Sequence, residues 1–291
     1  MKEFELLKHI YASKQTQNDP RHIGPGDDMA QVLFEPQRLL LGVDQLVVGK
    51  HVTAQTPPEL IGRKAVARSF SDIAAMGGAP VASLMTAALP PNTDDAWSHA
   101  VFNGAREVAE QWGGPIVGGD IAATEDAAPA VFTVTAIACA PRCDSIRRNT
   151  AVLDDNLYIT GTLGNSLAQH HLSFVPRIRE AQVLLQAVQI HAMIDVSDGL
   201  GQDASHLATA ELQLVIDPSL LPLREGASID GAMSDGEDYE LLFCCDETPP
   251  MQLLDCPVTK IGRVQRRLSG EPAVVDKAGN DLSSLGWRHE S

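Results

Sequence analysis

The aspartates of this chain recur as short clusters, each at the edge of an apolar or glycine-containing segment. The clusters lie at 26–28 (Gly-Asp-Asp), 43–44 (Val-Asp), 71–72 (Ser-Asp), 118–120 (Gly-Gly-Asp), 195–199 (Asp-Val-Ser-Asp-Gly) and 236–238 (Gly-Glu-Asp). Carboxylates at the ends of buried elements are costly unless a positive group binds them. Oxygen ligands of this kind select hard cations such as Mg²⁺, which proteins commonly hold together with a phosphate. The pattern therefore predicts an enzyme that binds Mg²⁺ and a nucleotide through scattered aspartates.

The acidic clusters lie in or beside the elements that the apolar pattern predicts. Strands are expected over 38–48, 115–117, 130–140, 156–161, 193–196 and 240–245, and helices over 57–77 and 94–112. Asp44 lies in the first strand, and the strand 115–117 is expected to end at the Gly-Gly pair before Asp120. Asp72 lies one turn before the end of the first helix, where a negative charge opposes the helix dipole, so its position requires another reason. Residues 197–200 lead from a strand into a helix, a place where backbone N–H groups favour phosphate.

The length and composition are those of a globular protein with two domains. The chain has 291 residues, of which 44% are hydrophobic and 4% aromatic, enough for cores packed mainly by aliphatic side chains. Residues 141–155 read as a connector, and we place the domains at 1–142 and 143–291. The formal charge of −16 argues against a nucleic-acid partner, because such a surface repels phosphate backbones. A phosphorylated substrate would need metal ions to screen the site.

The N-terminus and the cysteines indicate a cytoplasmic protein. The first eight residues lack the apolar stretch of a signal peptide, and no segment is apolar over the length of a membrane span. The five cysteines show no paired spacing typical of a zinc site, so we expect reduced, buried thiols.

Several common nucleotide-binding motifs are missing from the chain. There is no GxxxxGK[ST] sequence, no protein-kinase motif set, and the glycines at 24–26 do not continue as a dinucleotide fingerprint. If ATP binds, we therefore expect it to bind through a less common architecture.

Longer motifs occur in a fixed order along nearly the whole chain. They include 24–28 (Gly-Pro-Gly-Asp-Asp), 71–77 (Ser-Asp-Ile-Ala-Ala-Met-Gly), 118–120 (Gly-Gly-Asp), 158–164 (Tyr-Ile-Thr-Gly-Thr-Leu-Gly), 194–200 (Ile-Asp-Val-Ser-Asp-Gly-Leu), 236–243 (Gly-Glu-Asp-Tyr-Glu-Leu-Leu-Phe) and 286–289 (Gly-Trp-Arg-His). In this order the chain resembles the thiamine-monophosphate kinase family of PurM-like ATP enzymes. A single Asp-Gly pair is weak, whereas the motifs at 71–77 and 236–241 together are highly specific.

The resemblance implies a fold, a reaction and a set of residue roles. The implied fold is α/β (α+β) with two PurM-like domains, and the N-terminal mixed sheets of a homodimer pair into a barrel. The implied reaction transfers the γ-phosphoryl group of ATP to thiamine monophosphate, giving thiamine diphosphate, with several Mg²⁺ ions. Matched position by position, the implied Mg²⁺ ligands are Asp28, Asp44, Asp72, Asp120, Asp195 and Asp198; the ATP contacts are Gly119, Asp120, Arg148 and Ser197; and the thiamine phosphate pocket is lined by His51, Glu237 and Trp287.

The same residues suit phosphoryl transfer on chemical grounds. Two charged phosphate groups must approach in line, which needs positioning and charge neutralisation more than covalent chemistry. Several Mg²⁺ ions can shield the repulsion between the phosphates, and Arg148 adds a fixed positive charge. No residue stands out as a general base, and a phosphate acceptor that is already largely ionised near neutral pH does not require one.

Four places depart from the family pattern. They are Gly42 and Val43, where hydroxyl residues are usual before Asp44; Ser69 in place of Asn; residues 121–123 (Ile-Ala-Ala) in place of Thr-Thr-Arg; and Asp235 in place of Gly. These departures leave open a catalytically weakened homologue that binds nucleotide or thiamine phosphate. Another PurM-like ATP-dependent enzyme is a further alternative. A selenophosphate synthetase is disfavoured, because the first cysteine of the chain is Cys139.

Taken one at a time, most of these residues have an ordinary structural explanation. Asp27 and Asp28 are typical of a turn, and Ser197 of a helix N-cap. His51 after a strand and Trp287 near the C-terminus are each more often structural. The joint order of the motifs, rather than any single residue, therefore favours the kinase interpretation.

Overall fold

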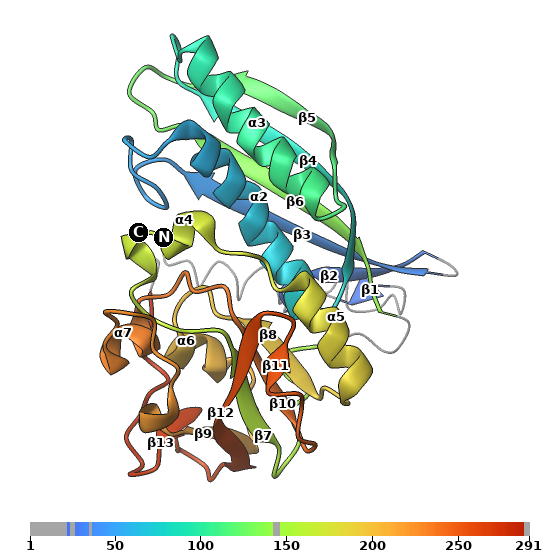
Figure 1. Cartoon of the computed structure of the whole chain (residues 1–291), viewed down its shortest axis with the longest axis vertical. Coiled ribbons are helices and arrows are strands. Elements are labelled where there is room, and N and C mark those ends of the chain that lie inside the picture. The colour runs from blue at the N-terminus through green and yellow to red at the C-terminus, as the bar shows by residue number, and fades with distance from the viewer. Residues whose placement is uncertain (1–21, 24–26, 35–36, 142–145, 288–291) are drawn as a thin grey trace.

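Two mixed sheets, formed by consecutive stretches of chain, make up the computed structural model (Figure 1). The structure describes residues 22–23, 27–34, 37–141 and 146–287. The N-terminal sheet has six described strands in the order β1-β2-β3-β6-β4-β5. They are β1 (His22–Ile23), β2 (Ala30–Phe34), β3 (Gln37–Val47), β4 (Ala79–Leu89), β5 (Ile116–Ala123) and β6 (Val131–Cys139). β4 and β5 are parallel and the other neighbours antiparallel, so this sheet is mixed, as predicted.

Two long helices, α2 (Pro58–Ala75) and α3 (Asp95–Gln111), cover one face of this sheet (Figure 1). α2 begins with Pro58, whose missing N–H is no loss at a first helical position. The Asp94 carboxylate caps α3 by accepting two backbone N–H groups of its first turn. Alternate residues of β6 are buried, which is the period of two expected for a strand covered on one face.

The C-terminal sheet has seven described strands, six of them in the order β13-β9-β12-β7-β10-β8, with β11 paired to β12. They are β7 (Asn156–Thr160), β8 (Ala192–Asp195), β9 (Leu212–Ile216), β10 (Leu241–Cys245), β11 (Gln252–Leu253), β12 (Cys256–Arg266) and β13 (Val274–Asp276). The helices of this half are α4 (His170–Ser173), α5 (Ile178–Ala187), α6 (Leu200–Ser205) and α7 (Ile229–Ser234), with 3₁₀ turns η1 (Ser166–Ala168) and η2 (Pro218–Leu220). Within the described residues, no helix is long and apolar enough to cross a bilayer.

The predicted elements are confirmed except for the end of one strand. The expectation that a strand ends at 118–120 is wrong, because β5 continues through these residues beside β4. Gly119 permits this close pairing, since a Cβ there would lie 1.8 Å from the backbone oxygen of Met85. The predicted domain boundary falls within 142–145, outside the described residues, and stays a prediction.

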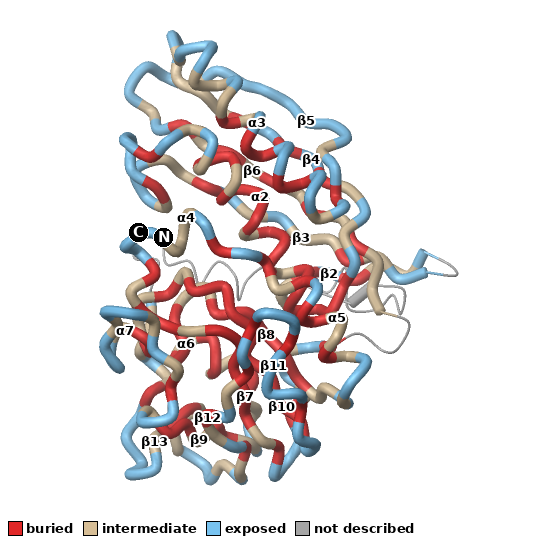
Figure 2. Tube along the Cα trace, viewed as in Figure 1, coloured by how far each residue is buried: buried red, intermediate tan, exposed pale blue. Residues whose placement is uncertain are grey.

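Helix α2 packs against both halves of the chain. Its buried Phe70 and Ile73 share one hydrophobic cluster with Phe174, Tyr239 and Phe243 of the C-terminal half. α2 also contacts α4, α5 and β8. In Figure 2 the buried stretch of α2 faces the buried part of the lower sheet. Any polar residue on this side of α2 is therefore held where the two halves meet.

The face of the N-terminal sheet opposite the helices is open in the single chain. In β4, residues 84 and 86 are exposed and alternate with the buried residues 83, 85 and 87. Seven of the eight residues of β5 are exposed, as its colour in Figure 2 shows. Val43 and Leu84 lie level with each other across β3, β6 and β4 and place large apolar side chains on the open face, where they are 63% and 38% exposed. Exposed apolar side chains grouped in this way are typical of an interaction surface.

Candidate active site

One side of α2 carries polar residues that meet the predicted metal ligands. Ser71 and Asp72 follow Arg68 by three and four residues, which places all three on one side of the helix. Ser71 Oγ donates a hydrogen bond to Asp195 Oδ2 at 2.5 Å, and Arg68 Nη2 lies 3.9 Å from Asp44 Oδ1. The helix therefore joins the acidic end of β8 to the acidic residue of β3.

Four predicted metal ligands lie close enough to perturb one another electrostatically. Burial raises the pKa of Asp72 well above its usual range, and its carboxylate neighbours Asp44, Asp195 and Asp28 raise it further. Burial and the charge of Asp195 likewise raise the pKa of Asp28. Burial, together with the charges of Asp44 and Asp198, outweighs the hydrogen bond from α2 and raises the pKa of Asp195 to about 6. These carboxylates form one partly buried, mutually repelling cluster.

The cluster fits a cation that arrives with a ligand. Within the described chain, Asp28 Oδ2 is buried without a hydrogen-bond partner. No three His, Cys, Asp or Glu side chains among the described residues already form a group that could hold a metal ion. Mg²⁺ is usually held by one or two carboxylates, while phosphate oxygens and waters complete its shell. The residues present therefore fit Mg²⁺ bound together with a phosphorylated ligand.

The loop after β8 is held by Asp203, a carboxylate that the sequence patterns did not single out. Asp203 Oδ2 accepts the backbone N–H groups of residues 197–199 at 2.9, 2.9 and 3.1 Å. Burial, and then the charge of Asp198, raises the pKa of Asp203 well above its usual range. The expectation that backbone N–H groups here are open to phosphate is wrong for 197–199, because Asp203 already occupies them. Ser197 is left with its hydroxyl for a ligand.

Arg148 lies beside the aspartates. Its Nη1 is 3.4 Å from Asp28 Oδ1, and its backbone N–H donates to Asp27 Oδ2 at 3.4 Å. The side chain is 19% exposed, so it remains accessible from solvent. Arg148 therefore partly offsets the negative charge at one side of the cluster.

Three acidic residues of the segment 236–240 each pair with one cation. The pairs are Glu237 with Lys64, Asp238 with Arg224, and Glu240 with Arg177. Arg177 binds both oxygens of its partner, at 2.7 and 2.6 Å, and Arg224 also donates to the Thr162 carbonyl at 2.7 Å. Of the three cations, Lys64 alone belongs to the N-terminal half. This motif is therefore mainly structural, apart from its first carboxylate.

The three predicted pocket residues connect to the same surroundings. The His51 ring accepts the backbone N–H of a residue four positions earlier at 2.9 Å, and its carbonyl accepts Lys64 Nζ at 2.7 Å. Lys64 also pairs with Glu237. The Trp287 backbone N–H donates to the Asp198 carbonyl at 2.6 Å, while the residue is 58% exposed. Lys64 thus joins His51 to Glu237, and Asp198 anchors Trp287.

The single chain does not bring Asp120 to the other five aspartates. Asp44 lies level with Gly119 across β3, β6, β4 and β5. Three strand spacings separate the two residues, or about 14 Å. Successive residues of a strand point to opposite faces, so Asp120 points away from the side to which Asp44 points and lies on the open face of the sheet, beside the exposed Thr86.

The departures from the family pattern fall in different environments. Gly42 lies in the cluster, because a Cβ there would be 3.7 Å from Asp72 Oδ2. Ser69 and Asp235 each make a hydrogen bond within the chain, so both are accommodated locally. Val43 is exposed on the open face of the sheet. Gly42 is therefore the departure with the most direct bearing on metal binding.

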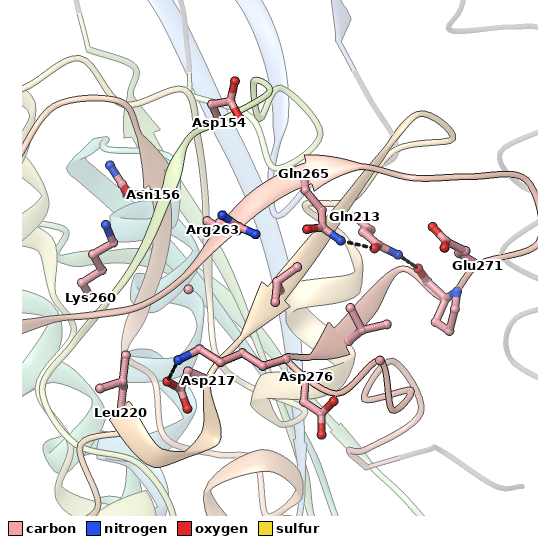
Figure 3. Close-up of a pocket in the computed structure, with 16 residues that line it drawn as sticks. Asp154, Asn156, Gln213, Asp217, Leu220, Lys260, Arg263, Gln265, Glu271 and Asp276 are labelled. Carbon is pink, nitrogen blue, oxygen red and sulfur yellow. Dashed lines mark hydrogen bonds and ion pairs between the residues drawn. The ribbon is translucent and has the colours of Figure 1, made fainter.

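A cavity of about 1000 Å³ lies elsewhere, over strands β9, β12 and β13 (Figure 3). Its lining is crossed by a Lys277–Asp217 ion pair and by a hydrogen bond from Gln265 to Gln213 at 2.6 Å. None of the predicted ligands is among the described residues that line it. The chemistry of the aspartates, rather than cavity size, identifies the candidate active site.

We expect the metal-free protein to lose stability as the pH rises from about 4 through 6. Asp28, Asp72 and Asp195 bind protons more tightly in the folded chain than in the unfolded chain, since burial raises their pKa values above the usual 3.8, to about 6 at Asp195. The folded state therefore holds the extra protons in this window, and the free energy of unfolding falls as they leave, by on the order of 2 kcal/mol. Urea unfolding in EDTA across this range measures the change.

The Asp72→Asn variant is the control for this experiment, and it should show a shallower pH dependence. Added Mg²⁺ at pH 8 should restore stability to the wild type, since a ligand that binds only the folded state stabilises it. A wild-type protein that is equally stable or more stable at pH 8 than at pH 5 in EDTA contradicts the expectation.

Sequence comparison groups the chain with known enzymes. The family model described as AIR synthase related protein, N-terminal domain, matches residues 26–140. The chain is 34% identical over 269 residues to the thiamine-monophosphate kinase of Rhodopirellula baltica, covering 84% of each protein. It is 30% identical over 293 residues to the thiamine-monophosphate kinase of Aquifex aeolicus, covering 91% of this chain and 92% of that one.

Solved structures show the same architecture. The structure of AaThiL complexed with AMPPCP and TMP superposes with a TM-score of 0.84 at 28% identity, over 99% of this chain and 97% of that one. The hydrogenase maturation protein HypE in complex with ATP has a TM-score of 0.69 at 19% identity, over 98% of this chain and 95% of that one, a likeness of fold alone.

Proposed function

The chain belongs to the thiamine-monophosphate kinase family, and we propose that the acidic cluster beside α2 is where it transfers the γ-phosphoryl group of ATP to thiamine monophosphate. The products are thiamine diphosphate and ADP, and we place the reaction in the cytoplasm. The observation that carries the proposal is the partly buried cluster of Asp28, Asp44, Asp72 and Asp195, whose mutual repulsion cations and phosphate would relieve. The likeness to AaThiL complexed with AMPPCP and TMP supports it.

The four clustered aspartates, with Asp198 on the adjoining loop, would hold Mg²⁺. The orphaned Oδ2 of Asp28 supports this assignment, because a buried carboxylate oxygen without a donor is costly. When bound, Mg²⁺ neutralises charge on the phosphate groups that react. The clustered side chains themselves supply the negative charge that would hold the cations beside α2.

The remaining groups position the two phosphates. Arg148 would contact the nucleotide as a permanent cation, and Ser197 would contact it through its hydroxyl. The acceptor phosphate supplies the nucleophilic oxygen and is largely ionised near neutral pH, so no side chain has to remove a proton. The acceptor pocket would be lined by His51, Glu237 and Trp287. In this scheme the chain contributes orientation and charge rather than a general base.

We further propose a homodimer in which a second copy covers the open face of the N-terminal sheet. The exposed Val43 and Leu84, which point to this face, supply apolar surface for such a contact. Asp120 lies on that face, remote from Asp44 within its own chain. A second copy would therefore present its Asp120, with the neighbouring Gly119, to the cleft of its partner, and each site would be built from both chains.

A catalytically weakened homologue is the second candidate, and Gly42 is the observation that favours it. This residue replaces a hydroxyl beside Asp72, so one cation site has fewer oxygen ligands than the family pattern implies. Turnover by purified protein separates the two candidates.

We expect ³¹P NMR of the purified protein with thiamine monophosphate, ATP and Mg²⁺ to show the diphosphate signals of thiamine diphosphate growing with those of ADP. The Asp72→Ala variant, run in parallel, should leave thiamine monophosphate unchanged. Wild-type protein that still binds ATP but leaves thiamine monophosphate unchanged rules out the kinase and selects the weakened homologue or another acceptor.

A further inference from the structure

We infer that Lys64 is a positioning residue for the acceptor side of the site: its ammonium group fixes Glu237 and the His51 loop in one arrangement where the two halves of the chain meet. The inference rests on the proposed function, which assigns Glu237 and His51 to the pocket for thiamine monophosphate. Lys64 lies within α2, a helix most of whose residues are buried, and no motif in the sequence marks it.

Lys64 is a cation without exposure to solvent, since its side chain is 0% exposed. A buried ammonium is costly unless acceptors replace water. Three acceptors surround its Nζ: the His51 carbonyl at 2.7 Å, His171 Nδ1 at 2.8 Å, and Glu237 Oε2. An ammonium group has three N–H donors, so all of them are used. Lys64 therefore has no donor left for a phosphate, and it can act only by holding other groups.

The contacts also define which ring nitrogen of His171 carries the proton. Because an ammonium group cannot accept a hydrogen bond, His171 Nδ1 accepts and the ring proton lies on Nε2. The same nitrogen is 3.4 Å from Glu237 Oε2, which is longer than its 2.8 Å contact with Lys64. Glu237 is thus held through Oε2. In the described part of the chain its Oε1 has no hydrogen-bond partner, so this oxygen is open to an acceptor molecule.

The three acceptors come from separate segments of the chain. His51 lies in the loop after β3, His171 in α4, and Glu237 in the loop before β10. The two neighbouring carboxylates of the Glu237 loop pair with arginines of the C-terminal half. Glu237 is therefore the one carboxylate of its motif that the N-terminal half holds, and Lys64 sets its distance from the His51 loop.

Glu237 has a backbone conformation that needs support from its surroundings. Its φ of 55° lies in the left-handed region, which is strained for a residue with a Cβ. Its backbone N–H donates to the Ser197 carbonyl at 2.7 Å, in the loop that carries Asp198. Lys64 holds the side chain of the same residue. Removing Lys64 therefore frees the acceptor side while the backbone contact with the nucleotide loop remains.

Steady-state kinetics of Lys64→Met test this role. The substitution keeps an apolar stem and removes the ammonium group. We expect KM for thiamine monophosphate to rise about tenfold or more, and KM for ATP to stay within about twofold, because a lost charged hydrogen bond is worth at least about that factor.

Arg63→Met is the matched control. Arg63 is the neighbouring cation of α2, and it donates to the Phe174 carbonyl at 2.6 Å, so it also crosses to the C-terminal half. It does not contact Glu237. Both KM values should therefore remain near those of the wild type in this variant.

A double-mutant cycle with Glu237→Gln shows whether Lys64 acts through Glu237. If it does, Lys64→Met/Glu237→Gln should raise KM for thiamine monophosphate no further than the more harmful single substitution. Effects that multiply in the double variant overturn the inference.

The pH profile gives a readout that does not depend on how well a Lys64 variant folds. Burial lowers the pKa of Lys64 to about 8, although the negative charge of Glu237 acts to raise it. Arg68 and His171 are the other titratable groups that face Lys64. Above this pH the ammonium is lost, and wild-type KM for thiamine monophosphate should rise between about pH 7.5 and 9, where the acceptor phosphate is already ionised. In Glu237→Gln the rise should be absent.

The outcomes separate this inference from the proposed function. A wild-type protein that does not phosphorylate thiamine monophosphate overturns the function before any variant is made. An active wild type overturns the inference if Lys64→Met leaves KM unchanged, or if Arg63→Met raises it equally. A flat wild-type pH profile, or an equal rise in Glu237→Gln, also overturns it.

Discussion

The Asp72→Asn variant should lose kinase turnover by about 10³-fold or more and should be more stable than the wild type without metal. The two effects have one cause. Burial and three negatively charged neighbours raise the pKa of Asp72, so its negative charge is costly in the empty site. With cations and phosphates bound, the same charge becomes necessary. Turnover assays and urea unfolding in EDTA, on the same preparation, measure both.

An exposed aspartate gives the control for this comparison. Asp255→Asn removes one charge from the surface, outside the cluster, and should change neither turnover nor stability. If Asp72→Asn retains turnover within about tenfold of the wild type, the cluster does not hold the catalytic cations. If it loses turnover and stability together, Asp72 has a structural role instead.

Mixing two inactive chains should restore activity if the site is shared between subunits. Asp72→Asn and Asp120→Asn are each expected to be inactive as homodimers. In a mixed dimer, one cleft contains both substitutions and the other contains neither. Random pairing makes half of the dimers mixed, so co-expression should give about one quarter of wild-type turnover.

The alternative arrangement predicts a different result. If Asp120 served the cleft of its own chain, each cleft of the mixed dimer would carry one substitution, and no activity would return. Leu84→Asp provides a second check. Leu84 points to the open face, so a charge there should prevent dimerisation and abolish turnover together, as gel filtration and assay would show. A monomeric Leu84→Asp protein with full turnover contradicts the shared site.

Much of this architecture could be predicted from the chain alone. The apolar runs of β3, β6, β7, β8 and β10 and the caps of α2 and α3 are local signals, and they hold in the structure. Four of the six aspartates, Asp44, Asp72, Asp195 and Asp198, lie in or directly beside such elements, and the order of the motifs grouped Asp28 with them. The end of β5 was misjudged because Gly118 and Gly119, usually turn residues, here permit close strand pairing.

The residues that sequence reasoning missed act over long distances in the chain. Lys64 meets Glu237 across 173 positions, and Arg177 meets Glu240 across 63. No sequence periodicity predicts such pairs, because each partner lies in a segment that has the composition of an ordinary helix or loop. Asp203 is different: it lies only four to six residues from the N–H groups it binds, so an acidic residue shortly after Asp-Gly could have been noticed.

Helix α2 gives the enzyme a mechanical property that neither half of the site has alone. Lys64 holds the acceptor side and Asp72 the cation side, and eight residues of helix separate them, about 12 Å of a nearly rigid rod. A ligand that displaces one end of the helix should therefore displace the other. We expect occupation of the two sides to be energetically coupled in this way. Linkage then makes the coupling reciprocal: the factor by which nucleotide changes the affinity for thiamine monophosphate equals the factor by which thiamine monophosphate changes the affinity for nucleotide.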